Sequence, residues 1–194
     1  MKMLIGLTGR SGSGKTSAAK ILTQLGAFVA DCDIIAHEVL FDDVVKEKLG
    51  ANFPHTIFDK NGNVDRKALG SIVFSDKEKL AVLNSIVHSA IVDKAIAMCI
   101  NSGKDICFID GSELEASGVD KKCAHIVVIR ADEKTRLHRI TERDAISEDA
   151  ARLRMQAQKE YSKKAIFVEN NGDFDALKLA VTDLYNQFLG EINV

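Results

Sequence analysis

The chain has 194 residues and a mass of 21.2 kDa, a length that fits one α/β or α+β domain with a full hydrophobic core. Hydrophobic residues make up 46% of the chain, which excludes wholesale disorder, and 26 basic against 28 acidic residues exclude the strongly positive surface of a dedicated nucleic-acid binder. No apolar run approaches the roughly 20 residues of a membrane span, and the N-terminal stretch turns glycine-rich too early for a secretory signal. We therefore expect a cytoplasmic protein with neither a nucleic-acid nor a membrane partner.

Five short apolar stretches, each bounded by glycine, aspartate or charged residues, have the pattern of buried parallel strands. They are residues 3–8, 27–30, 106–109, 126–129 and 165–168. Because parallel neighbours need crossover connections, and crossovers are normally helices, this alternation predicts an α/β fold with a parallel sheet covered on both faces.

Helical spacing of apolar residues indicates the connecting helices. The predicted helices are residues 17–25, 66–74, 79–100, 132–144 and 174–189. Residues 79–100 carry apolar side chains at three- and four-residue steps, which predicts a helix facing the core. Asp65 is the expected N-cap of the helix over 66–74, and residues 61–63 are expected to form a turn.

Residues 9–16 read GRSGSGKT, which fits the phosphate-binding pattern G-x-x-x-x-G-K-[ST] between an expected strand and an expected helix. Glycines let successive backbone N–H groups point at phosphate oxygens, and the helix N-terminus adds partial positive charge. Lys15 would reach the β- and γ-phosphates of a nucleoside triphosphate, and Thr16 would bind magnesium. The predicted nucleotide-binding residues are Gly9, Gly12, Ser13, Gly14, Lys15, Thr16 and Ser17.

Acidic residues follow two of the expected strands. Asp110 ends an apolar run in the Walker B pattern, where a carboxylate lies near magnesium, and Asp31 and Asp33 end the second strand. A carboxylate facing the phosphate loop could accept the proton of an attacking hydroxyl or hold the water shell of magnesium. Alternatively, Asp31 caps the next helix in a surface turn.

Arginines gather in the second half of the chain, at positions 130, 136, 139, 143, 152 and 154. Positions 136, 139 and 143 share one helical face, opposite Leu137 and Ile140, and could clamp a transferring phosphoryl group as part of a mobile lid. The alternative is a solvated amphipathic helix with neighbouring acidic side chains as partners.

With these residues in hand, the chain resembles the dephospho-coenzyme A kinase family over nearly its whole length. The resemblance rests on these segments: IGLTGRSGSGKT, LGAFVADCDIIAHEV, DKNGNVDRKALGSIVFSDKEKLAVLNSIVHSAI, ITERD with RLRMQAQ, and NNGDFDAL. It implies a single P-loop kinase domain over 1–194, of the P-loop NTPase type with a five-stranded parallel sheet. It also implies a helical substrate-binding region over about 36–100 and an arginine-bearing lid over about 136–158.

The resemblance implies phosphorylation of the ribose 3′-hydroxyl of dephospho-coenzyme A by ATP with Mg²⁺, the last step of coenzyme A synthesis. Asp33 matches the proposed base, His88 a substrate-side histidine, and Arg139 and Arg143 the lid arginines. Lys15 would act on the phosphates, while Thr16, Asp110 and Asp31 would serve the metal.

The chain departs from the family pattern at a few positions. Arg10 and Ser11 replace a glycine and an apolar residue in the phosphate loop, and Ser89 replaces a proline. Glu113 and Glu115 occupy positions that are apolar in the family, within the stretch 111–116. These changes leave two alternatives: another small-molecule kinase, with a nucleoside or nucleoside monophosphate as acceptor, or a nucleotide-binding regulatory protein without transfer activity. The oligomeric state stays open, a monomer included.

Overall fold

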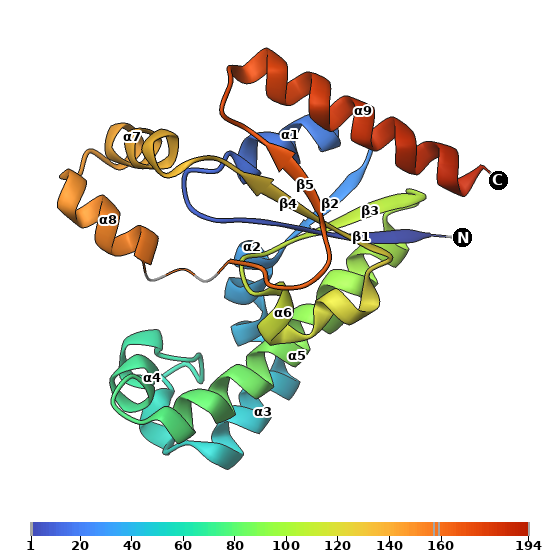
Figure 1. Ribbon diagram of the computed structural model, residues 1–194. Helices are drawn as coiled ribbons and strands as arrows, with labels where there is room; N and C mark the ends of the chain where they lie inside the picture. The colour runs from blue at the N-terminus through green and yellow to red at the C-terminus, as the bar shows by residue number, and fades with distance from the viewer. Residues whose placement is uncertain (1, 157, 159, 194) are drawn as a thin grey trace. The chain divides into compact units, whose positions relative to one another are not determined.

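The computed structural model describes residues 2–156, 158 and 160–193, which divide into two compact units. The first comprises Met1–Ala30 and Cys99–Val194, and the second comprises Asp31–Met98. The first unit contains the sheet, so the predicted α/β fold is confirmed (Figure 1).

The five predicted strands are all present, in the order β2-β3-β1-β4-β5. Their bounds are Met3–Gly9 for β1, Phe28–Asp31 for β2, Ile106–Asp110 for β3, His125–Arg130 for β4 and Ile166–Glu169 for β5. Strand β1 pairs in parallel with β3 and β4, and β4 pairs in parallel with β5. This order places β1 at the centre of the sheet, so the loop that follows β1 leaves from the middle of its carboxyl edge.

Helices α1 (Lys15–Gln24) and α9 (Phe174–Ile192) pack together on one face of the sheet (Figure 1). Alternate side chains of β1, such as Ile5 and Leu7, are fully buried in the core between the sheet and these helices. The other face carries the short helix α6 (Leu114–Ser117) and the 3₁₀ turn η3 (Val119–Lys122).

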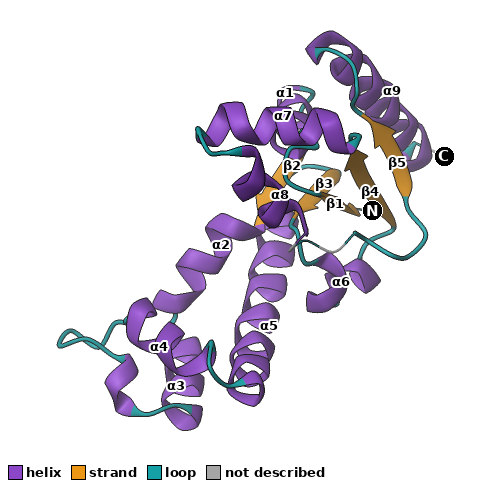
Figure 2. Cartoon of the chain, turned by 60° about the vertical axis from the view of Figure 1, so that its left-hand side comes forward, coloured by secondary structure: helices purple, strands orange, loops and turns teal. Residues whose placement is uncertain are grey.

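Helices α7 (Glu133–Asp144) and α8 (Glu148–Gln156) follow β4 and pack against each other (Figure 2). A small apolar cluster joins them, made of Leu137, Ile140, Ala151 and Met155 with the half-buried Ile146. Asp132 caps α7 by accepting a hydrogen bond from the backbone N–H of Thr135 at 2.7 Å. The pair is therefore a packed element with its own small core.

The second unit is helical. It contains α2 (Cys32–Glu38), η1 (Val39–Phe41), α3 (Asp43–Asn52), η2 (His55–Ile57), α4 (Arg66–Val73) and most of α5 (Lys77–Asn101). Asp65 caps α4 by accepting from the N–H groups of Lys67 and Ala68, as predicted. The predicted turn over 61–63 is also present, with Gly62 at a φ of 75°.

The expectation that the helix over 79–100 faces the core is only partly correct. Within α5, Ala95 and Cys99 are fully buried, whereas the five apolar residues that form the predicted stripe are half-buried. These are Leu80, Leu83, Val87, Ala90 and Ile91. The reason is length: α5 has 25 residues, and the neighbouring helices of its unit have 7, 10 and 8.

Among the described helices, α5 is also the one that is long and apolar enough to cross a membrane, judged by length and composition alone. That is weak evidence for a span. Lys94 in its second half forms an ion pair with Glu38 of α2 at 2.8 Å, beside the exposed Asp93. Charged side chains at the middle of a span are rare and costly, so this pair argues for a helix packed within the unit.

The turn between α7 and α8 predicts a stabilising substitution. Ala145 has a φ of 51°, in the left-handed region that costs an L-residue roughly 1–2 kcal/mol. We expect Ala145→Gly to raise the free energy of unfolding by about 0.5–1 kcal/mol, after the greater freedom of glycine in the unfolded chain is subtracted. Urea denaturation measures it. Ala150→Gly, at an exposed position inside α8, is the control and should lower stability by about 1 kcal/mol. Equal losses in both variants would contradict the strain at position 145.

Candidate phosphate-binding site

The predicted phosphate loop connects β1 to α1 at the carboxyl edge of the sheet. Gly12 and Gly14 adopt φ angles of 79° and 95°, which favour glycine. Space also requires glycine at both positions: a Cβ at residue 12 would lie 2.7 Å from the carbonyl oxygen of Arg136, and one at residue 14 would lie 2.1 Å from Nδ2 of Asn170. Two of the predicted loop glycines are therefore needed for backbone conformation and for close packing.

The N-terminus of α1 lacks a side-chain cap. Gly14 occupies the N-cap position, and no acidic residue lies in the first turn. Every other described helix of seven or more residues begins with a side chain that accepts from the backbone N–H groups of its first turn. Those capping residues are Asp31, Asp42, Asp65, Asp76, Asp132, Ser147 and Asp173. The N–H groups at the start of α1 are thus left for another acceptor.

Three consecutive carbonyl groups of the loop, residues 11–13, accept hydrogen bonds from distant side chains. Arg136 Nε donates to the first at 2.9 Å, Arg139 Nη1 to the second at 3.4 Å, and Asn170 Nδ2 to the third at 2.7 Å. Within the described chain, by contrast, no hydrogen bond uses the backbone N–H of residues 12 or 14–16. The loop therefore has its carbonyls bonded and its N–H groups available, which is the arrangement that binds an anion.

Lys15, the first residue of α1, forms an ion pair with Asp110 at the end of β3. The side chains are 18% and 6% exposed, so the pair is largely shielded from water. The β1–β3 register explains why these two side chains are in contact. Asp110 lies level with Leu7, two residues before Gly9, where the loop begins. Thr16 is exposed at the same end of α1. The structure thus brings together the predicted Lys15 and Asp110.

The predicted residues Asp31, Asp33 and His88 belong to the second unit. Asp31 ends β2 and caps α2, because its Oδ1 accepts from the N–H groups of Asp33 and Ile34 at 2.8 and 3.2 Å. The capping alternative for Asp31 is therefore confirmed. Asp33 is exposed in the first turn of α2, and His88 is half-buried on α5.

The three arginines expected on one face of α7 have different partners. Arg136 and Arg139 contact the phosphate loop, and Arg139 also donates to the carbonyls of Asn170 at 3.0 Å and Gly172 at 3.3 Å. Arg136 is 4% exposed, so it is buried like the apolar residues that were expected to lie opposite it.

Arg143, in the last turn of α7, forms a bidentate ion pair with Asp144, at 2.7 and 2.9 Å. Arg154 of α8 donates to the same carboxylate at 2.5 Å. The hydrogen bond from Arg143 lowers the pKa of Asp144 below its usual range, and the ion pair raises the pKa of Arg143. Asp144 therefore remains ionised and links the end of α7 to α8.

Both unusual residues of the loop contact the segment around the end of α8. Arg10 Nη2 donates to the carbonyl of Met155 at 3.0 Å. The N–H of Ser11 donates to Oε1 of Gln158 at 2.7 Å, and Nε2 of Gln158 donates back to the Ser11 hydroxyl at 3.2 Å. Reasoning from the sequence missed these contacts, although Gln158 lies within the stretch RLRMQAQ that carries the family resemblance.

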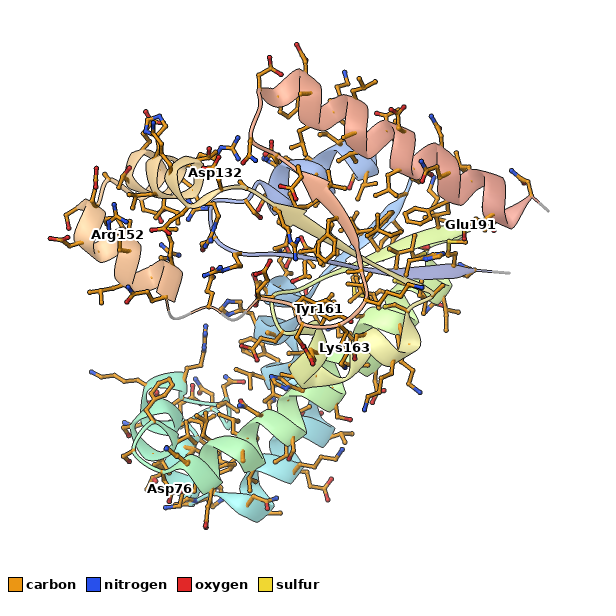
Figure 3. All side chains as sticks on the ribbon, in the orientation of Figure 1. Asp76, Asp132, Arg152, Tyr161, Lys163 and Glu191 are labelled. Carbon is orange, nitrogen blue, oxygen red and sulfur yellow. The ribbon has the colours of Figure 1, made fainter. Side chains whose placement is uncertain are left out.

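A cleft of about 1020 Å³ opens within the first unit beside the loop. Its walls come from the loop, the end of β4, α7, α8, and residues 112, 113, 115, 116, 158 and 160–162. Glu115 accepts from the Ser162 hydroxyl at 2.9 Å, while Lys163 binds the buried Asp120 at 2.5 Å. In Figure 3, Tyr161 and Lys163 lie together beside α6, and Asp132 and Arg152 lie on the α7–α8 side. One of the two unusual acids, Glu115, thus anchors the segment that returns from α8.

Asn170 offers a sharp test of how the loop is held. In Asn170→Asp the side chain cannot donate to the Ser13 carbonyl, and the new carboxylate would face that oxygen. We expect a loss of about 1–3 kcal/mol in the free energy of unfolding and weaker nucleotide binding. Asn171→Asp is the matched control for stability, because among the described contacts the Asn171 side chain accepts from the Asp132 N–H at 2.8 Å, and aspartate preserves that bond. Urea denaturation and ATP titration measure both effects. Equal stability and equal ATP affinity in the two variants would contradict the role of Asn170 in holding the loop.

Comparison with known proteins identifies the family. The model of the dephospho-CoA kinase family matches residues 3–175. A dephospho-CoA kinase of Fusobacterium nucleatum is 38% identical over 179 residues, covering 90% of this chain and 93% of the relative. One from Halalkalibacterium halodurans is 32% identical over 194 residues, covering 96% of each chain.

Solved structures agree in fold. The crystal structure of TT1252 from Thermus thermophilus matches with a TM-score of 0.77 and 26% identity, covering 96% of this chain and 97% of that one. A dephospho-CoA kinase from Campylobacter jejuni matches with a TM-score of 0.66 and 22% identity over the full length of both chains, which supports the fold alone. With the family model spanning most of its length and relatives above 30% identity, this chain belongs to the dephospho-CoA kinase family.

Proposed function

We propose that this chain transfers the γ-phosphoryl group of ATP to the ribose 3′-hydroxyl of dephospho-CoA, giving CoA and ADP. Membership of the dephospho-CoA kinase family supports the reaction class, the last step of CoA synthesis. The observation that carries the site assignment is the uncapped start of α1, with its N–H groups available beside Lys15. Dephospho-CoA kinases are soluble biosynthetic enzymes, and we place this one in the cytoplasm, with a single kinase domain over 1–194.

The loop and α1 would hold the phosphates of ATP. Backbone N–H groups of residues 12 and 14–16 would donate to phosphate oxygens, supported by the positive end of the helix dipole. Lys15 would exchange its ion pair with Asp110 for a contact with the β- and γ-phosphates. Because phosphoryl transfer depends mainly on positioning and charge stabilisation, this fixed cation supplies a large part of the rate.

The same end of the sheet offers oxygen ligands of the kind that Mg²⁺ prefers. The exposed Thr16 hydroxyl would bind the ion, with the carboxylates of Asp110 and Asp31 hydrogen-bonded to its waters. When bound, the ion would neutralise charge on the β- and γ-phosphates.

The acceptor would lie on the helical region over about 36–100. Asp33 would orient the ribose 3′-hydroxyl and take its proton, since the exposed carboxylate has no hydrogen-bond donor among the described residues. His88, which is half-buried on α5, would contact the acceptor.

The lid would comprise residues 136–158, with Arg139 and Arg143 as its catalytic cations. Arg139 now donates to backbone carbonyls and Arg143 to Asp144. Each would exchange these acceptors for oxygens of the transferring phosphoryl group as the lid closes. Neutral carbonyls are weaker acceptors than phosphate, so the exchange favours Arg139 in particular.

The first test measures ADP release from ATP with Mg²⁺, with and without dephospho-CoA, and locates the added phosphate by mass spectrometry. We expect acceptor-dependent ADP and a phosphate on the 3′ oxygen. Lys15→Ala should lower turnover by several powers of ten without unfolding the protein. Lys20→Ala, an exposed lysine of the same helix, should keep normal turnover.

Three results would contradict this proposal. ATP binding without acceptor-dependent ADP would indicate a regulatory protein. Transfer to nucleosides or nucleoside monophosphates in preference to dephospho-CoA would indicate another small-molecule kinase. Near-normal turnover of Lys15→Ala would remove that lysine from the reaction.

Asp33→Asn tests the base separately, because asparagine keeps the shape of the side chain but cannot accept the proton. We expect kcat to fall about 10²- to 10⁴-fold at neutral pH, with little change in ATP affinity. Asp43→Asn is the matched control: Asp43 also lies exposed in the first turn of its helix, and its ion pair with Lys46 is on the surface. Unchanged kcat in Asp33→Asn would reduce Asp33 to a positioning role.

A further inference from the structure

Arg10 and Arg136 come together at the cleft beside the phosphate loop. Arg10 belongs to the loop, and Arg136 extends from α7, whose backbone packs on Gly12. Both line the cleft, together with residues 8, 9 and 13 of the loop region. Two guanidinium groups thus lie at the opening where the phosphates of a substrate would enter.

Each of these arginines has an N–H group without a partner. Arg136 is 4% exposed and donates through Nε to the Ser11 carbonyl, but its Nη2 is buried with no hydrogen bond in the described chain. Arg10 donates through Nη2 to Met155, and its buried Nε has no partner either. An unpaired buried donor on a charged group is costly, so a missing acceptor is indicated.

No carboxylate neutralises the two arginines among the ion pairs of the described residues. The acidic side chains nearest Arg136 already have partners: Glu133 binds Arg152 and Glu160 binds Arg130, each at 3.0 Å. Burial lowers the pKa of Arg136, and the positive charge of Arg10 lowers it further. The pair therefore holds positive charge that a bound anion would compensate.

We propose that Arg10 and Arg136 form a second phosphate-binding position, which takes a substrate phosphate group in addition to those held by the loop backbone and Lys15. This rests on the proposed kinase function. Arginine suits the role because its planar guanidinium can donate two hydrogen bonds to one phosphate. The phosphate comes either from the γ-position of ATP or from the diphosphate of dephospho-CoA, and the two sources predict different binding defects.

The test is calorimetric titration of the full chain with ATP, ADP, dephospho-CoA and adenosine. The variants are Arg10→Ala, Arg10→Lys and Arg136→Gln, with Lys134→Ala as a control that removes an exposed cation from α7. Losing a charge-assisted hydrogen bond should weaken the affected ligand about tenfold or more. A loss for ATP but not ADP assigns the γ-phosphate; a loss for dephospho-CoA alone assigns the acceptor. Arg10→Lys should recover part of the affinity, and adenosine should bind all variants equally.

Two results would overturn the second phosphate-binding position. Affinities equal to those of Lys134→Ala would show that neither arginine touches a phosphate. Equal losses for ATP, ADP and dephospho-CoA, together with a lower melting temperature, would show that the arginines merely hold the loop against α8. The comparison of ATP with ADP affinities needs no turnover. It therefore tests the γ-phosphate assignment even if dephospho-CoA is not the acceptor.

Discussion

A loop that binds phosphate through its backbone must leave its N–H groups free while every buried carbonyl still finds a donor. In this protein the donors for residues 11–13 are side chains of α7 and of the segment after β5. These donors lie 125 to 157 positions away along the chain. The loop therefore acquires its shape only when the sheet, α7 and the β5–α9 connection are assembled, and its chemistry depends on the whole first unit.

The strand register of the sheet positions the loop relative to the side chains that hold it. The β1–β4 register sets Gly9 beside Ile129, so the loop and the start of α7 leave the sheet at the same level. The N–H of Asn170 donates to the carbonyl of Arg130 at 2.7 Å, which continues the β4–β5 pairing one residue beyond the strands. That bond fixes the backbone from which the Asn170 side chain reaches Ser13. Parallel pairing thus determines the position of a side chain that in turn holds the phosphate loop.

Local patterns were enough to predict the strands and the Asp65 cap, because short apolar runs and capping chemistry act over short distances along the chain. The ion pair between Lys15 and Asp110 was not predicted as such, although both residues were assigned to the phosphate site. The burial of Arg136 could not be predicted in this way. Helical periodicity assigns a charged side chain to the solvated face, and only the backbone of the distant loop gives this one a buried acceptor. The prediction for α5 was only partly correct for the converse reason, since an apolar stripe does not reveal how much of it other helices cover.

The net charge of the whole chain does not indicate which charged residues line the cleft. A formal charge of −2 excludes a generally cationic surface, yet the cleft gathers Arg10, Arg130, Arg136 and Arg152 on its walls. Acidic residues line the same cleft, and two of them, Glu160 and Glu133, bind Arg130 and Arg152. Among the ion pairs of the described residues, Arg10 and Arg136 have no carboxylate partner, and they lie next to the open N–H groups of the loop. Charge confined to a partly shielded cleft acts more strongly than the same charge spread over the surface, because water and salt screen it less. A nearly neutral protein can in this way hold the several negative charges of a nucleoside triphosphate without attracting polyanions elsewhere.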